Sequence, residues 1–117
     1  MNASPSTSFS IPFLRKGKVM MVHSSQIIRL EAQSNYTCIY FADRPPVIMA
    51  RVLKLYDKML KPHGFLRIHK THLINPQYVE DLDIPGKVQM KDQSLPEISR
   101  RKRREVIRYF SHPLTGS

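Results

Sequence analysis

Several residue types on which enzymes and membrane proteins depend are scarce in this sequence. Its 117 residues include one cysteine, four glycines and no tryptophan. No run of about 18 apolar residues is present, so we expect no membrane-spanning helix. The four glycines are too scattered to form the loops that hold phosphates in nucleotide-binding enzymes. Cys38 cannot form an internal disulfide, which predicts a reducing, cytoplasmic compartment and a buried packing role for this residue.

Recognisable catalytic and metal-binding arrangements are also missing. The sequence has no nucleophile elbow and no paired carboxylates of the kind that perform acid–base chemistry. His69 and His72 invite a metal interpretation, but no Cys, Asp or Glu lies close enough in the sequence to complete a ligand set. We therefore expect no metal, no cofactor and no catalytic activity.

Negative charge is scarce as well, since 9 acidic residues face 19 basic ones and leave a formal net charge of +10. Such an excess favours a polyanionic partner, meaning nucleic acid or an anionic membrane surface. Ser99 is followed by five consecutive cations at the start of a predicted helix, where like charges repel one another and oppose the helix dipole. Backbone phosphates would offset both effects. A second basic cluster, at residues 67–72, alternates with apolar residues and could contact phosphates or base edges.

The distribution of apolar residues predicts many short strands and two helices. Short polar breaks at 24–25 and 33–35 resemble hairpin connections, and several strands are apolar on both faces, which predicts stacked sheets. Apolar residues from Met49 to Leu60 follow helical spacing, and Pro62 and Gly64 end that helix. Ser99 can cap a final helix that continues to about residue 110. The expected strands are 18–23, 26–32, 36–41, 65–69, 72–75, 78–84, 87–90 and 94–96.

The length suits one domain with loose ends. Residues 1–12 are rich in Ser, Thr and Pro and lack the features of a signal peptide, so we expect a flexible tail or linker there. We expect the folded domain at residues 13–112 and a short C-terminal tail at 113–117.

Three segments resemble the LytTR DNA-binding domain: 28–36 (IRLEAQSNY), 65–75 (FLRIHKTHLIN) and 95–101 (LPEISRR). They occur in the family's order, and the resemblance extends from about residue 18 to 110. It implies a mostly β fold, an elongated stack of small antiparallel sheets with one internal and one C-terminal short helix. It also implies DNA binding through three loops, which place side chains in successive major grooves and the intervening minor groove.

The resemblance also assigns individual contacts. In the first loop Asn35 is the expected base contact, with Gln33 and Ser34 beside it. Lys70 falls on the middle loop, and Arg101 falls where a major-groove base contact is expected.

Other basic residues are expected to contact phosphates: Arg67, Arg100, Lys102 and Arg104. A further set of matching residues is expected to hold the loops by packing or hydrogen bonding, with His69 a buried, hydrogen-bonded framework residue: Glu31, Ala32, Tyr36, Phe65, His69 and Asn75.

The resulting hypothesis is a bacterial transcriptional regulator, or the output domain of a longer one, that binds double-stranded promoter repeats. Two copies would bind together and would recruit or occlude RNA polymerase. A module for RNA or single strands is the first alternative, with Tyr36, Tyr40, Phe41 and Tyr78 available for stacking but located in core-like runs. A second alternative is a basic module whose partner is an acidic protein or a membrane lipid. In that case the helix at 99–110 would lie on the anionic surface.

Overall fold

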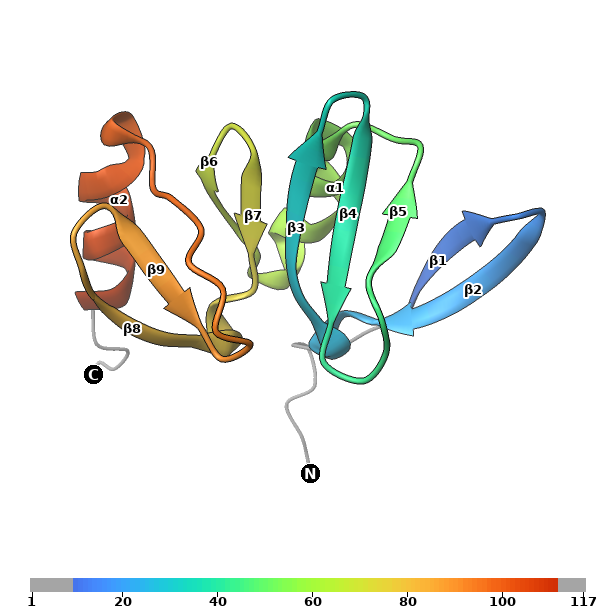
Figure 1. Cartoon of the computed structure of the whole chain (residues 1–117), viewed down its shortest axis with the longest axis horizontal. Coiled ribbons are helices and arrows are strands. Elements are labelled where there is room, and N and C mark those ends of the chain that lie inside the picture. Colours follow the sequence, from blue (N-terminus) through green and yellow to red (C-terminus); the bar gives the residue numbers. More distant parts are fainter. Residues whose placement is uncertain (1–9, 112–117) are drawn as a thin grey trace.

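A computed structural model describes residues 10–111, which form three antiparallel sheets and two α-helices (Figure 1). The first sheet is the hairpin β1–β2, the central sheet has the order β5-β4-β3-β7-β6, and the third is the hairpin β8–β9. The strands are β1 Ser10–Arg15, β2 Lys18–His23, β3 Ile27–Gln33, β4 Tyr36–Phe41, β5 Val47–Met49, β6 Leu66–His69, β7 His72–Ile74, β8 Val79–Ile84 and β9 Lys87–Met90, and the helices are α1 Leu53–Leu60 and α2 Arg100–Ser111. The mostly β fold with two short helices is thereby confirmed.

Folded structure begins earlier than residue 13. Strand β1 starts at Ser10, and Ile11 is only 1% exposed. Ile11 and Phe13 alternate with exposed neighbours and bury the inner face of the hairpin, so residues 10–12 belong to the domain and not to a tail. The remaining tail predictions, at 1–9 and 113–117, lie outside the described residues.

One of the two predicted hairpin connections is wrong. Strand β2 pairs with β1, whereas β3 pairs with β4 and β7, so the polar break after β2 joins two different sheets. A short 3₁₀ helix, Ser24–Gln26, makes this connection. The second break is a hairpin as predicted: Gln33 pairs with Tyr36, and Ser34 adopts a left-handed φ of 60°.

The predicted internal helix is also shortened at its start. Met49 lies in β5, where it pairs with Thr37, and α1 begins only at Leu53. Residues 94–96 do not form the expected strand, although a single bridge joins Lys87 to Glu97 nearby. Ser99 caps α2 as predicted, since its hydroxyl accepts a hydrogen bond from the Lys102 N–H at 3.2 Å.

The central sheet is buried on both faces, which confirms the prediction from its two-sided apolar strands. Leu30 and the opposed Leu73 enter one core, which the β1–β2 hairpin and α1 cover. Ile28 and Ile74 enter a second core, which contains residues of β8–β9 and α2. The central sheet therefore holds both ends of the molecule together. Neither described helix is long and apolar enough to cross a membrane.

Candidate nucleic-acid interface

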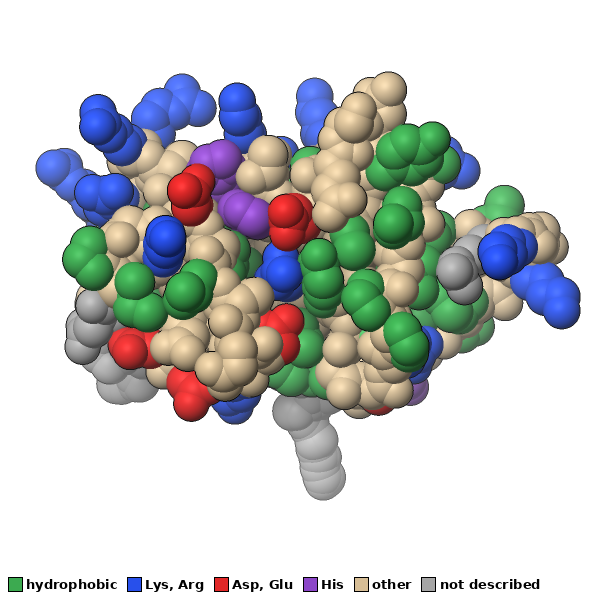
Figure 2. Space-filling model, viewed as in Figure 1, with side chains coloured by type: hydrophobic (Ala, Val, Ile, Leu, Met, Phe, Trp, Pro, Cys, Tyr) green, Lys and Arg blue, Asp and Glu red, His purple; other side chains and the backbone are tan. Residues whose placement is uncertain are grey.

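Three segments that are distant in the sequence lie at one edge of the molecule: the β3–β4 turn, the β6–β7 turn and the start of α2 (Figure 1). They carry Asn35, Lys70 and Arg101, all of which are exposed. On the face drawn in Figure 2, Lys and Arg side chains line this edge, and the Asp and Glu side chains lie below it. We call it the contact edge. The structure thus brings the three predicted base contacts to one surface.

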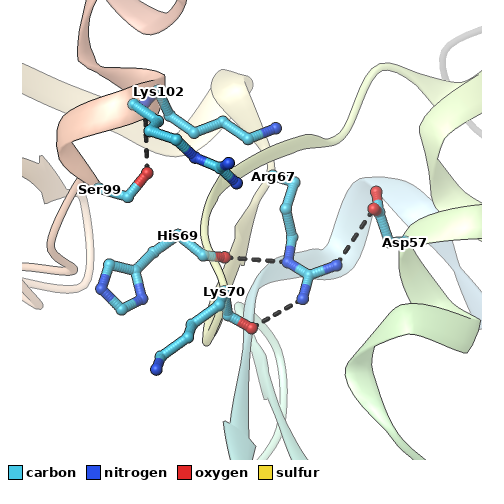
Figure 3. Close-up of a pocket in the computed structure, with 7 residues that line it drawn as sticks. Asp57, Arg67, His69, Lys70, Ser99 and Lys102 are labelled. Atoms are coloured by element: carbon cyan, nitrogen blue, oxygen red, sulfur yellow. Dashed lines mark hydrogen bonds and ion pairs between the residues drawn. The ribbon is translucent and has the colours of Figure 1, made fainter.

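Arg67 shapes the β6–β7 turn through its guanidinium. Its Nε donates to the carbonyl of His69 at 2.9 Å, and its Nη2 donates to the carbonyl of Lys70 at 2.7 Å (Figure 3). Its Nη1 contacts Asp57 Oδ2 on α1 at 3.2 Å. These bonds occupy much of the guanidinium, so Arg67 is placed to hold the turn.

His69 also holds this turn, although it is half-buried and not buried as predicted. Its Nδ1 accepts a hydrogen bond from the Thr71 N–H at 3.1 Å and lies 2.9 Å from the Thr71 hydroxyl. The Thr71 carbonyl in turn accepts from the Ala32 N–H of β3 at 2.9 Å. The β6–β7 turn is therefore tied to the hairpin that carries Asn35.

The start of α2 is tied to the same framework. The Ser99 N–H donates to the Ile68 carbonyl of β6 at 2.8 Å, and the Ile98 N–H donates to the Gly86 carbonyl in the β8–β9 turn at 2.8 Å. Of the five cations that follow, Lys102 is half-buried and the other four are exposed: Arg100, Arg101, Arg103 and Arg104.

A cleft of about 500 Å³ separates α1, the β6–β7 turn and the start of α2 (Figure 3). Its lining is mostly cationic: Asp57, Arg67, His69, Lys70, Ser99, Arg101 and Lys102. Asp57 is its one carboxylate, and that group is paired with Arg67. The cleft therefore suits an anionic group that reaches in from the contact edge.

Several framework predictions hold. Asn75 is 5% exposed and donates to the Ile27 carbonyl at 3.0 Å, while its Oδ1 accepts from the Gln77 N–H at 3.1 Å. Phe65 and Cys38 are buried, at 4% and 5% exposure.

Tyr36 differs from its predicted framework role, because it is 51% exposed beside the β3–β4 turn. The other three aromatic residues considered for stacking are engaged within the protein. Phe41 is buried, Tyr78 donates to the Ser25 carbonyl, and the Tyr40 ring lies 3.8 Å from the Arg29 guanidinium. These four residues therefore do not form an aromatic platform for single strands.

Arg29 on β3 and His72 on β7 line one small pocket together with Glu31, and neither was singled out as a framework residue from the sequence. Arg29 is 9% exposed and pairs with Glu31 at 2.8 Å, and its Nε lies 3.8 Å from Asp92 Oδ2 beyond β9. Burial lowers the pKa of His72 below its ordinary value, against a smaller opposing effect of Glu31. The signal that could have identified Arg29 is a cation inside an otherwise apolar strand.

Within residues 10–111, no group of three or more His, Cys, Asp or Glu side chains is arranged to hold a metal ion. His69 and His72 do lie together, with ring centroids 5.4 Å apart. A single carboxylate lies near this histidine pair, since His69 Nε2 is 3.9 Å from Glu97 Oε1.

Comparison with known proteins places the chain beside a family model, two curated regulators and a solved structure. Residues 17–111 match the family model described as the LytTr DNA-binding domain. Two heme-containing CO-sensing transcriptional regulators, RcoM 1 and RcoM 2 of Paraburkholderia xenovorans (strain LB400), are 29% and 27% identical over 79 residues, which make up 68% of this chain and 29% of each regulator. The chain thus spans less than a third of the length of these relatives.

A solved structure also matches: the LytTr DNA-binding domain of a protein from Bacillus cereus described as a methyl-accepting/DNA response regulator. It superposes with a TM-score of 0.67 at 15% identity and covers 87% of this chain and 95% of that domain. At this identity the match establishes the fold.

Proposed function

The chain belongs to the LytTR family of DNA-binding domains of transcriptional regulators, and we propose that it binds specific duplex sequences by placing the contact edge along successive grooves. The observation that carries this proposal is the convergence of the β3–β4 turn, the β6–β7 turn and the start of α2 at one cationic edge (Figures 1 and 2). Loops held by a rigid framework suit this task, because the framework fixes their spacing.

The exposed side chain of each segment has a suitable chemical partner in the grooves. The Arg101 guanidinium can donate two hydrogen bonds to O6 and N7 of guanine, and the Asn35 amide can pair with N6 and N7 of adenine. Lys70 can donate to guanine acceptors from a turn whose backbone Arg67 and His69 already fix.

The neighbouring cations of α2 would bind phosphates and set the register of the domain on the duplex. Arg100 and Arg104 are exposed for this role, and Lys102 reaches the cleft beside Lys70. We assign Arg67 to positioning and not to phosphate binding, because its three contacts lie within the protein.

We propose that in the cell this chain is the output domain of a bacterial transcriptional regulator. It would act in the cytoplasm by binding DNA and would catalyse no reaction. Two copies would occupy repeated promoter elements and recruit or block RNA polymerase. The relatives named as transcriptional regulators support this role.

Selection from randomised duplexes at about 150 mM salt tests the proposal, because non-specific phosphate binding is weakened there. We expect the wild type to enrich a discrete motif and Arg101→Ala to relax one base position, at a cost of about 1–3 kcal/mol. Arg108→Ala, an exposed site toward the other end of α2, is the matched control and should retain the full motif. Enrichment of no motif by the wild type, with binding that declines smoothly as salt rises, would contradict sequence-specific recognition.

A further inference from the structure

The β1–β2 hairpin forms one end of the molecule along its long axis (Figure 1). Its turn consists of Lys16 and Gly17, with φ of 52° and 76°, and Lys18 begins β2 directly afterwards. Left-handed φ at both turn positions favours Gly and Asn, so backbone preference does not explain a lysine at position 16. Lys16 and Lys18 are both exposed.

This turn is held in a fixed place by the body of the hairpin. Ile11, Phe13 and Val22 are at most 2% exposed and belong to the first core. The Phe13 ring also lies 5.8 Å from the ring of Tyr56 on α1. The hairpin is therefore a packed part of the domain, and its turn has a defined position relative to the contact edge.

The two lysines have no acidic partner in the part of the chain that the structure describes. Arg29, Arg44 and Arg67, in contrast, each pair with a carboxylate. The charge at the hairpin turn is thus available to an external anion.

The order of segments along the molecule suggests which anion this is. In Figure 1 the start of α2, the β6–β7 turn, the β3–β4 turn and the β1–β2 turn follow one another along the long axis. That axis measures 43 Å, which exceeds the roughly 34–36 Å of one helical turn of B-DNA. A duplex laid on the contact edge would continue past the β3–β4 turn toward the hairpin.

On the basis of the proposed function, we propose that Lys16 and Lys18 bind phosphates of the same duplex at its flank, beyond the segment contacted by the β3–β4 turn. In Figure 1 the hairpin turn is set back from the contact edge, so this contact requires the duplex to curve toward the hairpin. Flexible pyrimidine–purine steps in that flank would lower the cost of bending. The lysines would then add affinity and a preference for deformable flanks without reading any base.

The proposed phosphate contact is limited to the turn of the hairpin, because the outer face of its strands is apolar. Leu14, Val19 and Met21 are 59%, 65% and 57% exposed there, and apolar side chains do not bind phosphates. Val19 is adjacent to Lys18 and provides a matched control on the same hairpin.

The test compares wild type with the double variant Lys16→Asn/Lys18→Gln on duplexes that carry the selected motif. One duplex has long flanks, and two others are trimmed close to the motif on one side or the other. Asn suits the left-handed position, and thermal unfolding followed by circular dichroism checks that the variant folds. Val19→Thr and Lys91→Gln serve as controls, since Lys91 follows β9 at the opposite edge (Figure 1).

On long flanks we expect weaker binding by the double variant and a fall of about 1–2 in the slope of log Kobs against log salt concentration. On the duplex trimmed on the hairpin side, wild type and variant should bind equally, and the enriched motif should stay the same. Equal binding on long flanks, or an equal loss on every duplex, would overturn the hairpin contact while leaving the proposed function intact. Absence of any wild-type motif would instead refute the proposed function.

Discussion

Arg67 connects a basic cluster of the sequence to the shape of a turn. A sequence can show that a cation stands among other cations, but not whether its guanidinium meets a phosphate or the carbonyls of its own chain. Here two successive carbonyls, those of His69 and Lys70, accept from it, and Asp57 pairs with it. The sequence did not predict a role for Asp57 in holding the turn. The one feature that could have indicated it is a carboxylate within a helix of a mostly basic protein.

Substitution of Arg67 by Lys should therefore weaken DNA binding without changing the enriched motif. A lysine ammonium keeps the charge but lacks the planar fork that serves two carbonyls, and loss of such hydrogen bonds costs about 1–3 kcal/mol. Duplex titration measures the effect, and circular dichroism confirms the fold. Arg51→Lys, the same change at an exposed site, should have little effect; comparable losses in both variants would rule out a specific role for the fork.

His72 should make the stability of the domain depend on pH. Its pKa in the folded state is lowered, chiefly by burial, so the unfolded chain takes up a proton more readily. The contribution of neutral His72 to stability is therefore fully present above the ordinary histidine pKa of about 6.5. It is lost as the pH falls through that value toward the lower pKa of the folded state.

Urea unfolding at several pH values between about 7.5 and 5 measures this dependence. His72→Gln should show a smaller decrease in the free energy of unfolding over that range than wild type. Glu31, His69, Arg29 and Glu97 face the same site and remain in both proteins, so the difference isolates His72. An unchanged decrease in the variant would show that other groups cause it.

At the scale of elements, helix α2 combines a capped start with unfavourable charge. Ser99 accepts from the Lys102 N–H, and the arginines that follow oppose the helix dipole. Ser99→Ala should lower the free energy of unfolding by about 1 kcal/mol. Ser99→Asp retains a cap and places a carboxylate favourably for the dipole, so it should preserve stability.

The same aspartate should weaken DNA binding, because it lies beside the proposed phosphate contacts. Urea unfolding and duplex titration on both Ser99 variants separate the two effects. Equal stability of Ser99→Ala and wild type would contradict the capping argument, and undiminished DNA binding by Ser99→Asp would contradict the position of the phosphates.

Elements with a strong local pattern were predictable from the sequence, and those defined by their partners were not. The alternation at Ile11 and Phe13 is short and follows a polar segment, so the sequence pattern does not predict β1 and assigns its first residues, 10–12, to the tail. Met49 has the right spacing for a helix that ends at Leu60, yet its backbone pairs with Thr37 on a neighbouring strand. Likewise, a polar break cannot show whether the next strand returns beside the last one or joins another sheet.

At the scale of the whole molecule, one sheet belongs to two cores. Leu60 and Val106 are fully buried on opposite sides of it, in the first and second core respectively. Leu60→Ala should cost about 2–5 kcal/mol, and Val106→Ala should cost less because fewer methyl groups are lost.

In both variants the transitions seen by far-ultraviolet circular dichroism and tyrosine fluorescence should still coincide, since the two cores cannot unfold separately while they share a sheet. Separate transitions for the two probes would show that each core unfolds independently.

The placement of the candidate site also belongs to this scale. Composition and charge indicate a polyanionic partner, and the resemblance to the LytTR domain predicts Asn35, Lys70 and Arg101 as base contacts. Their convergence depends on pairings such as Ala32 with Thr71 and Ser99 with Ile68, which join distant segments and leave no local trace in the sequence.

The β6–β7 turn also bears on how such a domain diversifies. Arg67 binds the main chain of residue 70, and none of the bonds that hold the turn uses the lysine side chain. Position 70 can therefore exchange one side chain for another while the scaffold stays intact. A lineage built on this turn could acquire new target sequences through single substitutions there, so promoter preference would evolve faster than the fold that presents it.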